Sequence, residues 1–264
     1  MLLEEAPPAP AVGRRMADDI ILQTRGLTKE FKGFVAVNGV DLEVRRGTIH
    51  ALIGPNGAGK TTCFNLLTHF LTPTSGQILF NSREITGSPP AAIARMGMVR
   101  SFQISATFPH LTVLENVRIA LQSKRGGSFE FWRSARALAV LNDRAEELID
   151  AVGLAGFSAT PAVELPYGRK RALEIATTLA LDPEMMLLDE PTAGMAHEDV
   201  ERITALIKKV SANRTVLMVE HNLSVVSTLS DHITVLARGE ILAQGDYAAV
   251  SKNPDVVQAY MGTP

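Results

Sequence analysis

A glycine-rich segment, Gly54–Thr62, constrains the fold of this chain more than any other part of it. It reads GPNGAGKTT and matches the P-loop pattern G-x-x-x-x-G-K-[ST] at every fixed position. The apolar residues 48–53 before it predict a short buried strand, and residues 61–67 predict the start of a helix. A glycine-rich turn before an ordinary helix is the alternative, but the lysine, the adjacent hydroxyl and the preceding strand argue against it.

The groups in this segment suit a triphosphate. Glycines let backbone N–H groups point inward at a phosphate chain, and the helix N-terminus adds partial positive charge. Lys60 can reach the β- and γ-phosphates, and the Thr61 hydroxyl can ligate Mg²⁺. We therefore predict that the chain binds ATP with Mg²⁺. The predicted nucleotide-binding residues of this loop are Gly54, Pro55, Asn56, Gly57, Ala58, Gly59, Lys60, Thr61 and Thr62.

Length and composition exclude several classes of protein. The 264 residues can bury a sizeable core, and 46% hydrophobic residues are typical of a compact globular protein. No apolar run approaches the ~20 residues that cross a bilayer, and the first residues lack a secretory signal. The single cysteine, Cys63, excludes an internal disulfide framework. A net charge of −2 gives no general case for binding nucleic acid.

Hydrophobic patterning predicts an α/β fold with a parallel-sheet core of the P-loop, RecA-like type, a small antiparallel β subdomain and an inserted α-helical subdomain. Residues 1–19 are Pro-rich and are expected to be a disordered tail, and an ATPase domain is expected over 20–264. We expect 20–104 and 179–264 to form the core with the β subdomain, and 105–178 the helical subdomain. The expected strands are 20–24, 40–44, 77–80, 185–188 and 215–219, and the expected helices are 114–121, 135–152 and 198–210.

An apolar run that ends in two carboxylates, Met185–Glu190, is typical of a Walker B element. At the end of a buried strand, Asp189 is placed to hold Mg²⁺ directly or through water. Glu190, one residue later, could orient and deprotonate the water that attacks the γ-phosphate. Two acids that only cap the next segment are the alternative, but the upstream P-loop favours catalysis.

From about residue 20 to its end, the chain resembles an ABC-type ATPase subunit. The resemblance implies that Phe31 stacks on adenine, that Gln103 senses Mg²⁺ and the attacking water, and that His221 contacts the γ-phosphate. It also implies that Leu165, Tyr167, Gly168 and Arg169 bind the nucleotide of a partner subunit, since they stand where the family carries its Leu-Ser-Gly-Gly-Gln signature.

Two positions depart from the family pattern. Pro166 replaces the signature serine and supplies no hydroxyl, and Ala196 replaces the aspartate that usually follows the Walker B segment. In this family two ATPase subunits enclose two nucleotides. We therefore expect the site with this chain's own Glu190 to hydrolyse ATP, and the opposite site to turn over slowly if the pair is a heterodimer.

Smaller details resemble the ATPases of branched-chain amino-acid importers: the segments 165–176, 192–195, 108–117 and 253–262. This resemblance implies that the chain drives uptake of branched-chain or other hydrophobic amino acids. It also implies that the chain lies, as a peripheral subunit, at the cytoplasmic face of the inner membrane. The implied partners are two permease subunits, a second ATPase subunit, in a heterodimer or a homodimer, and a periplasmic solute-binding protein, with no nucleic acid. A urea or amide importer, a lipid exporter and a soluble ABC ATPase stay open as alternatives.

Overall fold

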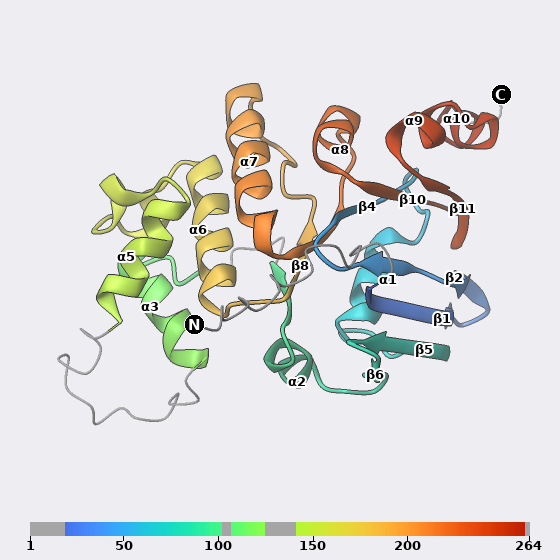
Figure 1. Cartoon of the computed structure of the whole chain (residues 1–264), viewed down its shortest axis with the longest axis horizontal. Coiled ribbons are helices and arrows are strands. Elements are labelled where there is room, and N and C mark those ends of the chain that lie inside the picture. The colour runs from blue at the N-terminus through green and yellow to red at the C-terminus, as the bar shows by residue number, and fades with distance from the viewer. Residues whose placement is uncertain (1–18, 102–106, 125–140, 262–264) are drawn as a thin grey trace, which may run out of the picture.

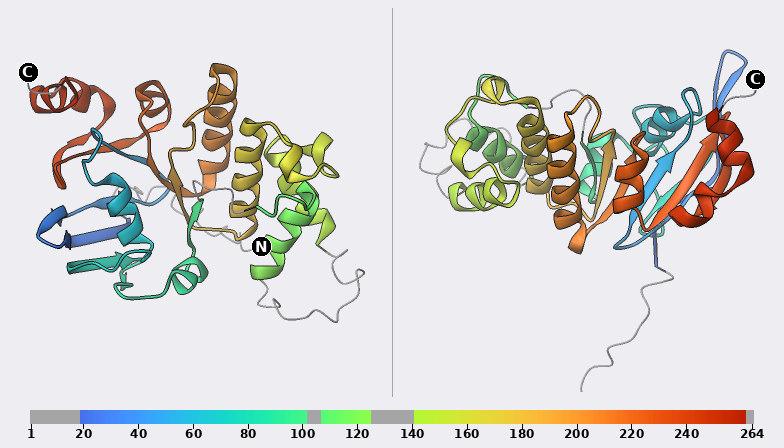
Figure 2. Two further views of the ribbon diagram at one scale, coloured as in Figure 1. Left: turned by 180° about the vertical axis from the view of Figure 1, so that it is seen from behind. Right: turned by 90° about the horizontal axis from the view of Figure 1, so that it is seen from above.

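The computed structural model describes residues 19–101, 107–124 and 141–261. Figure 1 shows two sheets at one end of the molecule and a group of helices at the other. Figure 2 gives the same division from behind and from above. The elements of the P-loop and of the Walker B segment lie in the part that contains the sheets. The predicted α/β fold, with a parallel core, an antiparallel sheet and a helical part, is therefore confirmed.

The main sheet has six strands in the order β11-β10-β4-β9-β8-β7. All neighbours pair in parallel except β10 and β11, which are antiparallel. Parallel strands end at one edge of a sheet, so the segments that follow β4, β8 and β9 meet there. The bounds are β4 (Ile49–Ile53), β7 (Met98–Ser101), β8 (Met185–Asp189), β9 (Thr215–Val219), β10 (His232–Ala237) and β11 (Glu240–Gly245).

The second sheet is antiparallel and is built around one long strand. That strand, β1 (Ile20–Phe31), pairs with three others because shifts in register let it bend from one partner to the next. The other strands are β2 (Phe34–Val40), β3 (Glu43–Arg45), β5 (Ser75–Phe80) and β6 (Arg83–Glu84).

Helices cover both faces of the main sheet and form the distal part of the molecule (Figure 1). On one face lies α1 (Lys60–Leu67), and on the other are α7 (His197–Val210), α8 (Leu223–Leu229) and α9 (Tyr247–Ser251). The distal part contains α3 (Val113–Lys124), α5 (Asn142–Ala151) and α6 (Tyr167–Ala180), which pack on one another. The remaining helices among the described residues are α2 (Pro90–Arg95), α10 (Pro254–Met261) and the 3-10 helices η2 (Ala155–Phe157), η3 (Ala162–Glu164) and η4 (Ser211–Asn213).

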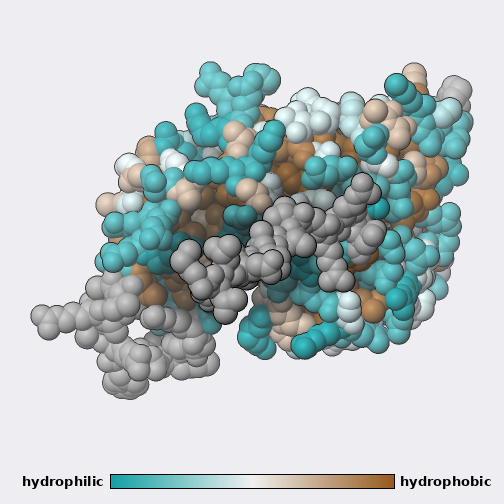
Figure 3. Space-filling model, viewed as in Figure 1, coloured by the Kyte–Doolittle hydropathy of each residue, from teal (hydrophilic) through white to brown (hydrophobic). Residues whose placement is uncertain are grey.

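Alternate residues of the central strands enter two separate hydrophobic clusters. Along β8, Met186 and Leu188 join the cluster beneath the helical part, whereas Met185 and Leu187 join the cluster beneath α1 and the antiparallel sheet. The second cluster also contains Cys63, whose thiol is fully buried. On the face shown in Figure 3, hydrophobic side chains reach the surface in separate areas between wider hydrophilic ones.

Some expected elements differ from the structure: the strand expected at 20–24 extends to Phe31 as β1. The strand expected at 40–44 is interrupted, because β2 ends at Val40 and β3 begins at Glu43. There, the Asp41 carboxylate accepts a hydrogen bond from the Gly26 N–H at 2.6 Å, and the Thr24 hydroxyl accepts one from the Leu42 N–H at 2.9 Å. The helix expected from residue 135 is described only as α5, since residues 135–140 lie outside the described residues. Among those described, no helix is both long and apolar enough to cross a bilayer.

Removal of buried volume from a central strand tests this packing. We expect Leu187→Ala to lower the free energy of unfolding by about 2–5 kcal/mol, because Leu187 is fully buried and the cavity would be held open by its neighbours. The matched control is Val257→Ala on the exposed face of α10, for which we expect less than about 1 kcal/mol. Urea unfolding followed by circular dichroism measures both, and equal losses would contradict the description of the core.

Candidate functional site

The P-loop connects β4 to α1 at the carboxyl edge of the main sheet. Two of its glycines are required by close contacts. A Cβ on Gly54, whose φ is +150°, would lie 2.1 Å from the Leu236 carbonyl oxygen. A Cβ on Gly59, whose φ is +98°, would lie 2.4 Å from the carbonyl oxygen of Ala36 on β2. The loop is therefore fixed by β10 on one side and by the β1–β2 hairpin on the other.

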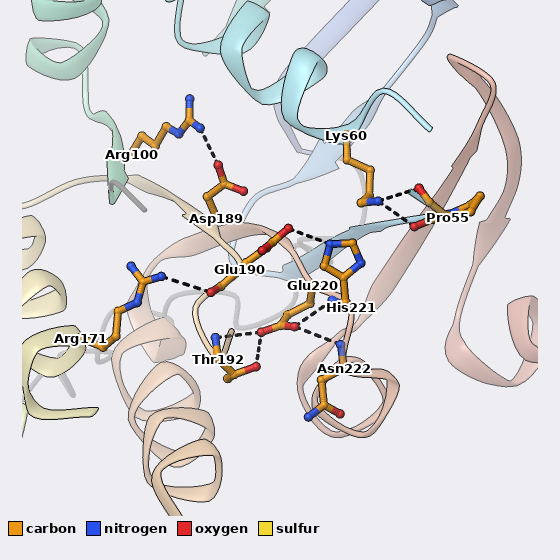
Figure 4. Close-up of polar contacts among 11 residues, drawn as sticks. Pro55, Lys60, Arg100, Arg171, Asp189, Glu190, Thr192, Glu220, His221 and Asn222 are labelled. Atoms are coloured by element: carbon orange, nitrogen blue, oxygen red, sulfur yellow. Dashed lines mark hydrogen bonds and ion pairs between the residues drawn. The ribbon is translucent and has the colours of Figure 1, made fainter. Parts of the chain in front are cut away.

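Lys60 is the first residue of α1, and its ammonium group lies over the loop (Figure 4). The Nζ atom donates hydrogen bonds to the carbonyl oxygens of Gly54 at 2.7 Å and of Pro55 at 2.9 Å. Burial lowers the pKa of Lys60, and the negative charge of Glu190 acts in the opposite direction. The amino group thus stands between the loop backbone and Glu190, which directly follows β8.

Asp189 ends β8 and is held by a cation from the neighbouring strand. Its Oδ2 atom accepts a hydrogen bond from Nη2 of Arg100 at 2.5 Å, and Nη1 of Arg100 donates to Oδ1 of Asn65 at 2.6 Å. The Arg100 guanidinium also lies 5.8 Å from the ring centroid of Phe64 and 5.9 Å from that of Phe70. Oδ1 of Asp189 is buried and has no hydrogen-bond partner among the described residues.

The unpartnered Oδ1 atom of Asp189 bears on whether the residues present could hold a divalent cation. A carboxylate oxygen without a partner is a suitable ligand for Mg²⁺, which is usually bound by one or two carboxylates, substrate phosphates and water. The described residues hold no group of three or more acidic, His or Cys side chains that could bind a metal by themselves. The donor set therefore fits a cation that arrives with a phosphate chain.

Glu190 follows Asp189 and has an unusual backbone conformation. Its φ of +46° lies in the left-handed region, which costs a non-glycine residue on the order of 1–3 kcal/mol. Its N–H donates to the Val219 carbonyl at 2.9 Å, so it continues the pairing of β8 with β9. Its Oε1 atom lies 2.7 Å from Nε2 of His221. Since an ionised carboxylate only accepts, the imidazole Nε2 is the donor.

Glu220, between β9 and His221, is a part of the site that the sequence reasoning missed. It is buried, and its carboxylate accepts hydrogen bonds from Thr192, His221 and Asn222 (Figure 4). The signal that could have found it is an acid at the end of an apolar strand, Thr215–Val219, which is the pattern that identified Asp189.

The segment expected to contact a partner's nucleotide begins α6. Leu165 is in the core, and Pro166 directly precedes the helix. Tyr167 is half exposed, and its hydroxyl donates to the Ala193 carbonyl at 3.2 Å. The Arg169 guanidinium lies 3.8 Å from the ring centroid of Phe157. A Cβ on Gly168 would lie 2.5 Å from Cγ of Asp199, so this glycine is also needed for the contact between α6 and α7.

Two residues join this region to the backbone that follows β8. Besides the contact of Tyr167, Nη2 of Arg171 donates to the backbone carbonyl of Glu190 at 3.4 Å. Arg171 is itself buried and paired with Glu174 at 2.6 Å. Movement of α6 as a rigid body would therefore displace the segment that carries Glu190.

Phe31 lies in the hairpin beside the P-loop. Phe31 is 41% exposed at the end of β1, opposite Phe34 in the hairpin that touches Gly59, and Nζ of Lys29 lies 5.1 Å from its ring centroid. Gln103 lies outside the described residues. The sequence reasoning did not foresee Tyr260 on α10: burial raises the pKa of its phenol, and a hydrogen bond from the Gly54 backbone acts against that rise.

A mostly apolar groove of about 370 Å³ lies between α3 and α6 of the helical part and α2 and β7. Side chains of α2, β7, α3 and α6 line it, and Arg100 is among them. Phe108 and Ile119, both exposed, stand at this groove.

Comparisons with known proteins agree with the geometry. Residues 37–193 match the model of the ABC transporter family, and residues 240–264 match that of the branched-chain amino acid ATP-binding cassette transporter. The high-affinity branched-chain amino acid transport ATP-binding protein BraF of Pseudomonas aeruginosa is 40% identical over 92% of this chain and 98% of its own length. The LivG protein of Escherichia coli K12 is also described as a high-affinity branched-chain amino acid transport ATP-binding protein. It is 41% identical over 92% of this chain and 98% of its own length.

Solved structures show the same architecture. An ATP-binding cassette of an ABC transporter in its ADP conformation superposes with a TM-score of 0.80 and 30% identity, over 92% of this chain and 99% of that one. A nucleotide-free ATP-binding cassette superposes with a TM-score of 0.81 and 29% identity, over 92% of this chain and 100% of that one. The chain therefore belongs to the ABC transporter family, as one of its nucleotide-binding ATPase subunits.

Proposed function

We propose that this chain is the ATP-hydrolysing subunit of an importer that takes up branched-chain or other hydrophobic amino acids. The observation that carries the proposal is the gathering of Lys60, Asp189, Glu190 and His221 at the carboxyl edge of one parallel sheet. The solute class is supported by the names of the BraF and LivG proteins and by the match at residues 240–264.

The nucleotide is proposed to lie on the P-loop, with adenine against Phe31. Lys60 would exchange the carbonyls of Gly54 and Pro55 for the β- and γ-phosphates, at little cost because both partners are hydrogen-bond acceptors. Thr61, Asp189 and Gln103 would hold Mg²⁺, which neutralises charge on the phosphate oxygens when bound.

Glu190 is proposed to orient and deprotonate the attacking water, and His221 to contact the γ-phosphate. The contact of 2.7 Å between them fixes the carboxylate relative to the imidazole. Phosphoryl transfer depends mainly on positioning of the reacting groups and on stabilisation of charge. Glu190 and His221, held in a fixed arrangement beside the phosphate, would supply that positioning.

The proposed assembly contains a second ATPase subunit, two permease subunits and a periplasmic solute-binding protein, with this chain at the cytoplasmic face of the inner membrane. Pro166 and Ala196 weaken what the chain offers to its neighbour's site. A different ATPase subunit is therefore the proposed partner, and the site with Glu190 the one that turns over.

The groove beside Ile119 is the proposed contact with a permease. It is apolar, and its lining comes from both the core and the helical part, so a bound segment would be affected by a movement between them. Differential binding energy between open and closed pairs is what can drive such a movement.

We expect Glu190→Gln to lower ATP turnover of the assembled transporter about 100-fold or more, because the amide cannot take a proton from water. Nucleotide affinity, measured by calorimetry, should change little, whereas Lys60→Ala should weaken it. Phosphate release measures turnover, and uptake of labelled leucine measures transport. Turnover within twofold of the unaltered protein would contradict the role of Glu190, and uptake of another solute alone would contradict the solute class.

For the groove, we expect Ile119→Glu to abolish co-purification with the permeases, since docking would bury a carboxylate in an apolar site. ATP affinity of the chain should be unchanged. The matched control is Val257→Glu, an exposed valine on α10 outside the groove, which should still co-purify. Retention of the permeases by Ile119→Glu would place the contact elsewhere.

A further inference from the structure

Glu220 is a buried carboxylate that stands apart from the proposed catalytic groups. It is 2% exposed, and it accepts hydrogen bonds from four described donors. Oε1 accepts from the Thr192 N–H at 3.0 Å and from the Thr192 hydroxyl. Oε2 accepts from the N–H groups of His221 at 2.8 Å and Asn222 at 3.1 Å. These donors take the place of water around a charge that burial would otherwise make costly.

Each carboxylate oxygen holds a different segment of the site. Oε1 holds Thr192, which follows the β8 strand and Glu190, and Oε2 holds the backbone that carries His221 after β9 (Figure 4). Regular pairing of β8 with β9 ends at Asp189 and Val219. Beyond that point the Glu190 N–H bond to the Val219 carbonyl and the Glu220 carboxylate connect the two backbones.

The left-handed conformation of Glu190 needs such an anchor. Its φ of +46° is sparsely populated by non-glycine residues, so neighbouring contacts must hold it. The turn that follows is closed by the Ala193 N–H, which donates to the Glu190 carbonyl at 3.1 Å, and Thr192 lies inside that turn. Release of Thr192 would let Glu190 relax and move its carboxylate away from His221.

We propose that Glu220 is a positioning residue for ATP hydrolysis, which sets the separation of Glu190 and His221 by binding Thr192 and the His221 backbone to one carboxylate. The inference rests on the proposed roles of Glu190 and His221. Glu220 acts through these residues rather than through a contact of its own with the nucleotide.

The test is Glu220→Gln, which keeps the shape of the side chain. An amide has one accepting oxygen, and its NH₂ group only donates, so one pair of N–H or hydroxyl donors loses its acceptor. We expect kcat for ATP hydrolysis by the assembled transporter to fall tenfold or more, with KM for ATP within twofold. Amide hydrogen exchange at Thr192 or at His221 and Asn222 should become at least tenfold faster, as expected for a lost hydrogen bond to a charged group.

Two further variants separate positioning from folding. Thr192→Ser keeps every donor and should retain near-normal kcat, whereas Thr192→Val loses only the hydroxyl and should lower kcat less than Glu220→Gln. Thr192 and Glu220 belong to one hydrogen-bond network. Adding Thr192→Val to Glu220→Gln should therefore lower kcat by a smaller factor than Thr192→Val does in the unaltered protein. Ile207→Val, a core substitution on α7, is the control for lost stability. Its kcat is compared with that of Glu220→Gln under conditions in which the two variants have equal melting temperatures.

A kcat for Glu220→Gln within twofold of the unaltered protein, while Glu190→Gln is inactive, overturns the proposal alone. The proposal is also overturned if Ile207→Val, at an equal melting temperature, lowers kcat as much as Glu220→Gln does. Turnover retained by Glu190→Gln overturns the proposed function itself, and this inference with it.

Discussion

The parallel pairing of β4, β9 and β8 is the constraint on which the rest of the site depends. Every residue of these three strands is buried, so the interior of the sheet has no place for charged groups. Apart from His50, the polar side chains of these strands, Thr215 and Asp189, lie at strand ends, and the in-register pairing brings the carboxyl ends to one edge. The P-loop, the carboxylates after β8 and the imidazole after β9 are close together because their strands are neighbours.

This constraint also explains what could be predicted from the sequence. An apolar run of about five residues followed by a carboxylate is a local pattern, and it is sufficient to locate Asp189 and Glu190. Lys60 is located by a second local pattern, the P-loop motif. The interrupted strand at 41–42 was not predictable, because Asp41 and Thr24 bind backbone groups of residues distant in sequence. The pair of Arg100 with Asp189, 89 residues apart, and the bond between Tyr260 and Gly54 are tertiary contacts of the same kind.

Arg100 connects two regions that serve different purposes. Its side chain lines the apolar groove, and its guanidinium ends on the carboxylate of Asp189 and the amide of Asn65. Arg100 therefore connects whatever fills the groove to the carboxylate of Asp189. The contacts of Tyr167 and Arg171 give α6 a second connection to the same edge of the sheet.

The single cysteine makes the core observable. Cys63 is fully enclosed one turn into α1, and burial raises the pKa of its thiol to about 12. A thiol-specific dye needs both access and a thiolate, and the folded chain denies it both. The rate of labelling therefore reports how often the packing beneath the phosphate loop comes apart, without an engineered probe.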